Sequence, residues 1–189
     1  MIVLIPIGGI GQRFKDNGYS RPKALINVFG NTIISYLLDN LNKSIIDYIF
    51  IPYNKEYQKF RFEEMLKKNY PEVQFKFFRL EENTRGAAET INIGLTNLKE
   101  ERDIPILCLD SDNFFVSDIV EQWNGENCIF TIKDTNPKPI FSYVQSDENS
   151  IIHDIREKDK ISDFASTGAY GFQSIQDLLQ YTQKIIDNN

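Results

Sequence analysis

The stretch from Ile2 to Leu25, IVLIPIGGIGQRFKDNGYSRPKAL, decides the fold. Its first six residues, 2–7, are almost wholly apolar, as expected for a strand buried on both faces of an α/β sheet. The strand ends at Gly8 and Gly9, and Gly11 follows closely. Glycine tolerates positive φ angles, so the backbone can turn successive N–H groups toward one point and bind phosphate oxygens. A buried strand followed by a glycine turn therefore predicts an anion-binding loop.

Two cations that follow the glycines strengthen this prediction. Arg13 offers a planar fork and Lys23 a compact point charge, which together suit a polyphosphate. Pro22 keeps Arg21 out of the helical region and holds the lysine on a defined path. Residues 1–30 carry a net charge of +3, whereas the rest of the chain carries −9. We expect a small anionic ligand at this loop and no nucleic-acid partner.

Three other interpretations of the glycine loop are a plain turn, a P-loop and a dinucleotide-binding loop. Two glycines after a strand can form a simple tight turn with solvated cations. A P-loop needs Gly-Lys-Ser/Thr at its end, which the sequence lacks. The dinucleotide fingerprint needs a third glycine where Phe14 stands, and the second expected strand ends at 51–54 without an acid for a ribose.

The length of 189 residues predicts a single domain spanning 1–189. No apolar run approaches the roughly 20 residues of a membrane-spanning helix. The N-terminus has no positively charged region before its apolar run, so we expect no signal peptide, no membrane partner and a cytoplasmic protein. Cys108 and Cys128 lie in apolar segments and are expected to be reduced core residues, and no cysteine–histidine cluster indicates a structural metal. His153, the only histidine, is expected to be structural.

Hydrophobic periodicity predicts alternating strands and helices over the first 110 residues. The expected strands are 2–7, 45–51, 73–80 and 104–109, and the expected helices are 31–41, 55–68 and 87–98. This order predicts an α/β, Rossmann-like fold with a mixed, mostly parallel central sheet flanked by helices. Short strands at 128–132, 140–145 and 151–156 predict a small antiparallel β excursion over the carboxyl edge, and a further strand opens at 167–170. Ser174 is expected to cap a final amphipathic helix.

Acids follow the fourth strand directly, in the sequence Asp110-Ser111-Asp112-Asn113. Ligands of open α/β sheets bind at the carboxyl ends of the strands. Two carboxylates delivered there together suit Mg²⁺, which takes one or two carboxylates plus phosphate oxygens. The alternative is a turn stabilised by local Asp and Asn hydrogen bonds.

A second glycine junction occurs at Arg85-Gly86, where the third strand passes into a helix. Such a junction lets a ligand approach the backbone near a helix N-terminus. The alternative is a plain connection without a ligand.

The runs GGIGQRF and RPKAL together resemble the nucleotidyltransferase signature of the sugar-phosphate nucleotidyltransferases, the NDP-sugar pyrophosphorylases with a GT-A-like fold. The chain departs from the pattern at Gln12, where Thr or Ser is more frequent, and in the linker KDNGYS. The resemblance implies an enzyme that joins a nucleoside triphosphate to a sugar phosphate and releases pyrophosphate. It implies nucleotide-binding roles for Gly8, Gly9, Gly11, Arg13 and Lys23, with Arg13 and Lys23 also catalytic.

The resemblance also implies roles for later residues. LDSDNFF is similar to the Gly-Asp-Asn metal motif of the family, with Asp112 as the matching Mg²⁺ ligand and Asp110 as an additional acid. Arg85 and Gly86 correspond to the loop that contacts the nucleotide base. The sugar phosphate would be held by three residues: Glu157, Lys158 and Gly168.

In members of this family a second aspartate that binds the metal usually comes after the region of the final helix, which Ser174 is expected to cap. This sequence has no clear counterpart. The chain is then a compact member, a C-terminally truncated one, or one that relies more on Asp110 and the phosphates.

Three alternative functions stay open. The second substrate can be a non-sugar phosphorylated metabolite, as in cytidylyltransferases that use phosphocholine. An Asp-X-Asp glycosyltransferase would use Asp110 and Asp112 but would not need Arg13 and Lys23. A non-catalytic nucleotide-sugar sensing module is the third. In each enzymatic case the partners are a nucleotide and a small molecule, and an oligomer is possible.

Overall fold

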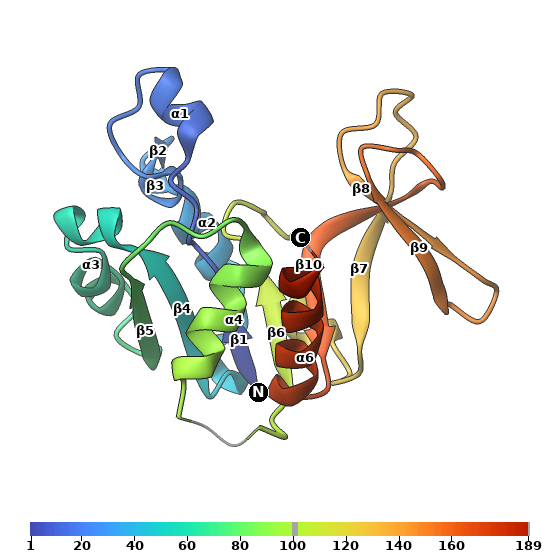
Figure 1. The fold of residues 1–189 in the computed structure, drawn as a ribbon. Helices are drawn as coiled ribbons and strands as arrows, with labels where there is room; N and C mark the ends of the chain where they lie inside the picture. The colour runs from blue at the N-terminus through green and yellow to red at the C-terminus, as the bar shows by residue number, and fades with distance from the viewer. Residues whose placement is uncertain (100–101, 189) are drawn as a thin grey trace.

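One eight-stranded sheet organises the computed structural model, which describes residues 1–99 and 102–188 (Figure 1). Strand β1 lies at its centre, in the order β5-β4-β1-β6-β10-β8-β9, and β7 pairs with the other edge of β10. The strands β5, β4, β1 and β6 are parallel to one another, whereas β10 runs antiparallel to β6. The parallel strands are β1 (Ile2–Leu4), β4 (Tyr48–Asn54), β5 (Phe75–Leu80) and β6 (Ile106–Leu109).

The antiparallel strands continue the same sheet sideways from β10 and form the arm seen in Figure 1. The register of β10 against β7 shifts between Ser166 and Tyr170, and the sheet bends there. These strands are β7 (Cys128–Lys133), β8 (Ser142–Ser146), β9 (Ile152–Glu157) and β10 (Phe164–Phe172). The predicted fold class, a mostly parallel sheet with an antiparallel excursion, is confirmed.

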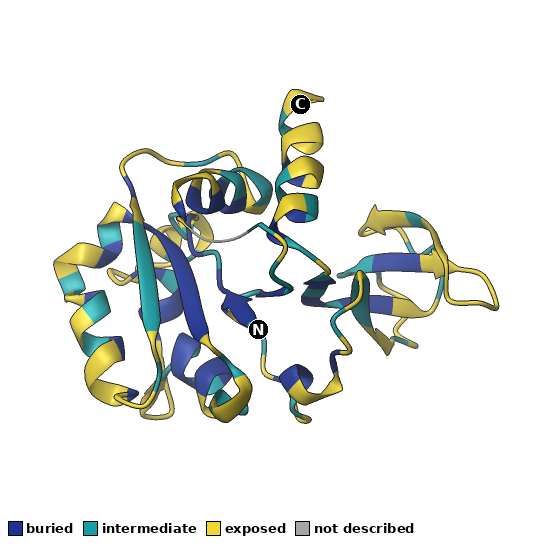
Figure 2. Cartoon of the chain, turned by 90° about the horizontal axis from the view of Figure 1, so that it is seen from below, coloured by how far each residue is buried: buried dark blue, intermediate teal, exposed yellow. Residues whose placement is uncertain are grey.

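Helices cover both faces of the parallel strands. Successive side chains of β1 point to opposite faces of the sheet and enter two separate buried clusters. Ile2 and Leu4 pack with residues of α4 and α6, whereas Val3 packs with residues of α2, α3 and α5. Figure 2 shows that the central strands are buried while much of the arm is exposed. The helices are α1 (Gln12–Asp16), α2 (Ile33–Asp39), α3 (Phe62–Asn69), α4 (Ala87–Asn97), α5 (Ile119–Gln122) and α6 (Ile175–Asp187).

The helix predicted at 31–41 is shorter, because its start forms a hairpin. Strands β2 (Asn27–Val28) and β3 (Asn31–Thr32) are joined by Phe29 and Gly30, which both have positive φ angles of 48° and 99°. Two such residues make the tight turn that favours hairpins. Helix α2 then begins with Thr32 as its N-cap, whose side chain accepts a hydrogen bond from the backbone of Ser35.

The helix predicted at 55–68 is wrong as one continuous element. A 3₁₀ helix, η3 (Lys55–Phe60), precedes α3, and Arg61 between them has a left-handed φ of 51°. Five residues along an α-helix turn by about 140°, so Tyr57 and Phe62 could not share a face of one helix. The break lets both aromatic rings enter the core, where their centroids lie 5.1 Å apart.

Several other boundaries differ from the prediction. Strand β1 is regular only to Leu4, and Ile7 adds an isolated parallel bridge to Tyr53. The strand predicted at 45–51 begins at Tyr48, after the short 3₁₀ helix η2 (Lys43–Ile45). A further 3₁₀ turn, η1 (Lys23–Leu25), follows the glycine loop.

Two further predictions are confirmed. Ser174 caps α6 by accepting a hydrogen bond of 3.0 Å from the backbone of Asp177. Cys108 is buried, Cys128 is half-buried, and both are free thiols.

Within residues 1–99 and 102–188, no helix is both long and apolar enough to cross a membrane.

Candidate active site

The loops that follow β1 and β6 meet at the point where the strand order reverses. The chain runs from β1 to β4 and β5 on one side, then crosses to β6 on the other. Ligands of open α/β sheets bind at such a switch point. A cavity of about 410 Å³ lies there, and its lining includes Gly9, Gly11, Arg13, Lys23, Asp110 and Asp112.

The three glycines of the loop serve different purposes. Gly11 has a φ of 65° and precedes α1, whose Phe14 donates a backbone hydrogen bond of 2.9 Å to the Gly11 carbonyl. Gly9 lines the cavity, and a Cβ atom there would meet no atom within 4 Å. Gly8 packs against α4, because a Cβ atom at Gly8 would lie only 2.1 Å from the Oγ1 atom of Thr90. The loop therefore needs Gly8 for close packing and Gly11 for backbone conformation.

Lys23 and Asp112 form an ion pair across the cavity. The sequence assigned the lysine to phosphate and the aspartate to a metal, and the structure places the two groups together. Each side chain is about one-third exposed. A partly exposed pair of this kind contributes at most about 1 kcal/mol, so a bound ligand can replace it.

Asp110 lies behind this pair, at the end of β6. Its backbone N–H donates a hydrogen bond of 2.8 Å to the carbonyl of Gly168 on β10. Burial raises the pKa of the Asp110 carboxyl from 3.8 to about 6, and the negative charge of Asp112 adds to this increase, whereas Lys23 opposes it. The carboxylate is thus held at an energetic cost at a position where a cation would stabilise its charge.

Two carboxylates that line the same cavity fit a divalent cation that completes its shell with phosphate oxygens and water. The Lys23 ammonium group already occupies a cationic position beside Asp112. Among residues 1–99 and 102–188, no group of three or more His, Cys, Asp or Glu side chains is arranged to hold a metal.

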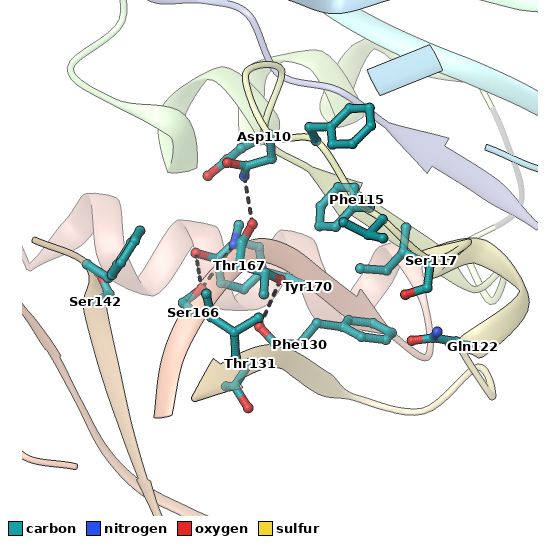
Figure 3. Close-up of a pocket in the computed structure, with 17 residues that line it drawn as sticks. Asp110, Phe115, Ser117, Gln122, Phe130, Thr131, Ser142, Ser166, Thr167 and Tyr170 are labelled. Atoms are coloured by element: carbon teal, nitrogen blue, oxygen red, sulfur yellow. Dashed lines mark hydrogen bonds between the residues drawn. The ribbon is translucent and has the colours of Figure 1, made fainter. Parts of the chain in front are cut away.

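A second cavity, of about 580 Å³, shares Asp110 with the first and lies at the bend of β10 (Figure 3). Its aromatic walls are Phe114, Phe115, Phe130, Phe141 and Tyr170. Among the described residues that line it, none is Lys, Arg or His. This cavity therefore suits an organic group that is neutral or cationic.

Gly168 lines the second cavity and has a φ of 75°. A Cβ atom there would lie 2.1 Å from Nδ2 of Asn113 and 2.5 Å from Oδ2 of Asp110. The Asn113 amide in turn donates a hydrogen bond of 2.7 Å to the carbonyl of Thr167. The bend in β10 and the loop after β6 are thus packed together at Gly168, and the space that a Cβ atom would take is filled by Asn113 and Asp110.

The structure does not bring Arg85 and Gly86 to either cavity. Arg85 pairs with Glu89 through its side chain and its backbone N–H. Gly86 precedes α4 with extended backbone, which any residue can adopt. Both line a separate hollow of about 360 Å³ between the start of α4 and residues 185–186 of α6.

Glu157 and Lys158 lie at the end of β9 and pair with each other at the surface. Lys158 lowers the pKa of Glu157, and the charge of Arg13 contributes in the same direction. The backbone N–H of Lys158 donates a hydrogen bond of 2.8 Å to Phe141, which lines the second cavity. The pair therefore lies next to a residue that lines the second cavity, and it lines neither cavity itself.

Sequence reasoning missed Ser166 and Tyr57 at the site, whereas Tyr170 belongs to the segment after Gly168 that the resemblance assigned to the sugar phosphate. Ser166 and Tyr170 of β10 line the second cavity and are joined by a hydrogen bond of 3.1 Å. Tyr57 lines the first, and its hydroxyl accepts a hydrogen bond from the backbone of Ala24, next to Lys23. The burial of Ser166 is visible only in the structure, and Tyr57 was indistinguishable in the sequence from a core aromatic residue.

The fold and this site define a nucleotide-binding α/β enzyme, with a glycine loop and paired carboxylates at the switch point of its sheet. Residues 2–186 match the nucleotidyl transferase family. The chain belongs to this family, and it is an enzyme that transfers nucleotidyl groups.

Solved structures share the fold over nearly the whole chain. A nucleoside-diphosphate-sugar pyrophosphorylase from Vibrio cholerae superposes with a TM-score of 0.79 and 23% identity, covering 98% of this chain and 78% of that one. A UDP-glucose pyrophosphorylase complexed with UDP-glucose has a TM-score of 0.75 and 16% identity, covering 97% and 79%. An inositol-1-phosphate CTP transferase from T. maritima superposes with a TM-score of 0.75 and 15% identity, covering 100% of this chain and 82% of that one. No curated protein matches the sequence.

Proposed function

We propose that the enzyme joins a nucleoside triphosphate to a sugar phosphate and releases pyrophosphate, giving an NDP-sugar. The observation that carries the proposal is the pair of cavities that meet at Asp110. One has cations and a glycine loop, as a triphosphate requires, and the other combines aromatic and neutral polar side chains with Asp110, as suits the hydroxyl groups of a sugar. The two substrates would thus meet beside the carboxylates.

The cationic cavity is the proposed triphosphate site. Gly8, Gly9 and Gly11 would present backbone N–H groups, and Arg13 and Lys23 would neutralise charge on the departing pyrophosphate. Lys23 would exchange Asp112 for a phosphate oxygen, at little cost because the ion pair is partly exposed.

Asp110 and Asp112 would hold a divalent cation, which we propose to be Mg²⁺. When bound, this ion supplies charge neutralisation at the triphosphate. The residues fit it because the buried Asp110 carboxylate needs a positive neighbour, and the donor set contains only hard oxygens.

The proposed reaction requires no protein nucleophile or general base. An anionic oxygen of the acceptor phosphate forms a bond to the α-phosphorus, and the bond from that phosphorus to the α–β bridging oxygen breaks. Pyrophosphate leaves with the bonding electrons, and no proton has to move. Catalysis then rests on positioning and charge neutralisation.

The acceptor would occupy the second cavity, whose lining includes Gly168. Lys158 is the proposed partner of its phosphate. The side chain is 60% exposed and paired with its neighbour Glu157 at the surface, so it can turn toward the cavity. Arg85 and Gly86 stay the proposed base loop.

A second candidate acceptor is a phosphorylated metabolite that is not a sugar, such as phosphocholine. The second cavity has five aromatic rings, and Asp110 is the only charged side chain among the described residues that line it. This combination favours a cationic organic group. The chemistry of nucleotidyl transfer would be unchanged.

A thermal-shift screen of CTP, UTP, dTTP, ATP and GTP with Mg²⁺ identifies the nucleotide. Pyrophosphate release is then measured with sugar 1-phosphates, inositol phosphate and phosphocholine. The proposal expects release that depends on both one nucleotide and one sugar phosphate. Release with phosphocholine alone would select the second candidate. Nucleotide binding without release across the panel would contradict both and indicate a sensing module.

A further inference from the structure

A buried amide at the end of β4, Asn54, connects the glycine loop with the segment that precedes α4. Asn54 is 1% exposed. Its Nδ2 atom donates hydrogen bonds of 3.1 Å to the carbonyl of Gly8 and 2.9 Å to Oδ1 of Asn83. Its Oδ1 atom accepts one of 3.0 Å from the backbone of Glu56 and so caps η3.

Both donors of this amide are therefore used, and they point to two different loops. Gly8 opens the proposed triphosphate loop, and Asn83 lies two residues before the proposed base loop at Arg85. The backbone of Asn54 also donates a hydrogen bond of 3.1 Å to Ile7, just before Gly8. One residue thus fixes the relative position of the two loops.

A second contact supports the same junction. The hydroxyl groups of Thr84 and Thr90 lie 2.7 Å apart and are hydrogen-bonded. A Cβ atom at Gly8 would lie 2.9 Å and 2.1 Å from these two oxygen atoms. The segment before α4 is therefore in direct contact with the first glycine of the loop, and no side chain can come between them.

We infer that Asn54 is a positioning residue that links recognition of the nucleotide base to binding of the triphosphate. Asn54 does not line the cavity and so acts through Gly8 and Asn83. This inference rests on the proposed nucleotide site. It assigns to Asn54 an effect on nucleotide affinity and base preference, and none on the acceptor.

The substitution Asn54→Asp tests this inference, since it keeps the shape of the side chain and the acceptor that caps η3. A carboxylate cannot donate, so the Gly8 carbonyl would face a negatively charged oxygen. Losing a buried hydrogen bond of this kind should raise the KM for the preferred nucleotide about ten- to hundredfold. We expect the ratio of kcat/KM between the preferred and the next nucleotide to fall about tenfold, with the acceptor KM unchanged within about twofold.

Asn42→Asp is the matched control. Asn42 also caps a 3₁₀ helix, by accepting a hydrogen bond from the backbone of Ser44, and its Nδ2 atom also donates to another segment, at Glu121. Its substitution therefore makes the same chemical change away from the nucleotide cavity. We expect Asn42→Asp to lower the Tm without changing the nucleotide KM or base preference.

The inference is overturned if Asn54→Asp lowers only the Tm, or if it changes the acceptor KM as much as the nucleotide KM. Should that variant not fold, Asn83→Ala removes only the exposed acceptor, and an unchanged base preference would then overturn the inference. Calorimetric titration with the nucleotide alone separates the two proposals. Absent turnover in the wild type refutes the proposed reaction, whereas equal nucleotide affinity in the wild type and Asn54→Asp refutes the positioning role.

Discussion

Replacing Asp110 with asparagine removes a carboxylate that the fold buries between two cavities. Burial and the charge of Asp112 raise the pKa of Asp110 from 3.8 to about 6. A shift of this size, at 1.36 kcal/mol per pKa unit, corresponds to a penalty of up to about 3 kcal/mol for the ionised folded state. The variant Asp110→Asn carries no such penalty, because an amide does not ionise.

Proton linkage gives the direction in which the stability difference between Asp110→Asn and the wild type changes with pH. A carboxyl whose pKa is higher in the folded state binds more protons there, so its contribution to stability is fully present below the unfolded pKa. That contribution is lost as the pH rises from about 4 through about 6. We expect Asp110→Asn to match the wild type near pH 4 and to be more stable by up to about 3 kcal/mol near pH 8.

Urea unfolding of both proteins, in EDTA and without nucleotide, measures the difference at several pH values. Asp112→Asn serves as the comparison, since it removes the smaller cause of the raised pKa of Asp110 and leaves its burial unchanged, so it should stabilise the fold near pH 8 by less than Asp110→Asn does. A stability difference for Asp110→Asn that does not change with pH, or a variant less stable than the wild type near pH 8, would refute this account of Asp110. We expect the same substitution to abolish most of the activity, because a proposed metal ligand is lost.

Three further predictions follow from the contacts. Lys23→Ala should reduce the rate of pyrophosphate release about 10²–10³-fold with little change in Tm, and near wild-type turnover would remove Lys23 from the proposed mechanism. Gly168→Ala should lower the free energy of unfolding, measured with urea, by about 1–3 kcal/mol more than Gly125→Ala does. Both glycines have positive φ angles, but only at Gly168 would a Cβ atom meet other atoms within 4 Å. Equal decreases for the two variants would contradict this prediction. Leu38→Ala, at a fully buried position of α2, should cost about 2–5 kcal/mol, whereas Phe29→Ala at a 99% exposed position should change the free energy of unfolding little.

The sequence predicted the parallel core because buried strands and amphipathic helices leave clear periodic patterns. The glycine loop, Lys23 and the acids after β6 were predicted at the same place for a simple reason. The carboxyl ends of adjacent parallel strands necessarily meet at one edge of the sheet. The structure brings Gly9, Arg13, Lys23 and Asp110 to one cavity, in agreement with that expectation.

Features that depend on long-range packing could not be predicted. The break at Arg61 arises because Tyr57 and Phe62 both enter the core, which local helix propensity does not reveal. The role of Asn54 depends on contacts with Gly8 and Asn83, which are 46 and 29 residues away.

Most of the lining of the second cavity could not be predicted for a related reason, although Gly168, which lines it, was among the residues expected to hold the sugar phosphate. Its walls come from the loop after β6 and from the bend of β10, and these segments meet only when β10 pairs antiparallel with β6. No local pattern in the sequence indicates that pairing.

The central claim is that the α-phosphorus of a nucleotide is transferred to a phosphorylated acceptor. The most direct test follows nucleotide labelled at either the α- or the γ-phosphorus, in the presence of Mg²⁺ and the acceptor identified by the screen. The account predicts that the α label appears in the product and the γ label in pyrophosphate, in equal amounts. Transfer of the γ label to the acceptor, or consumption of the nucleotide without pyrophosphate, would contradict it.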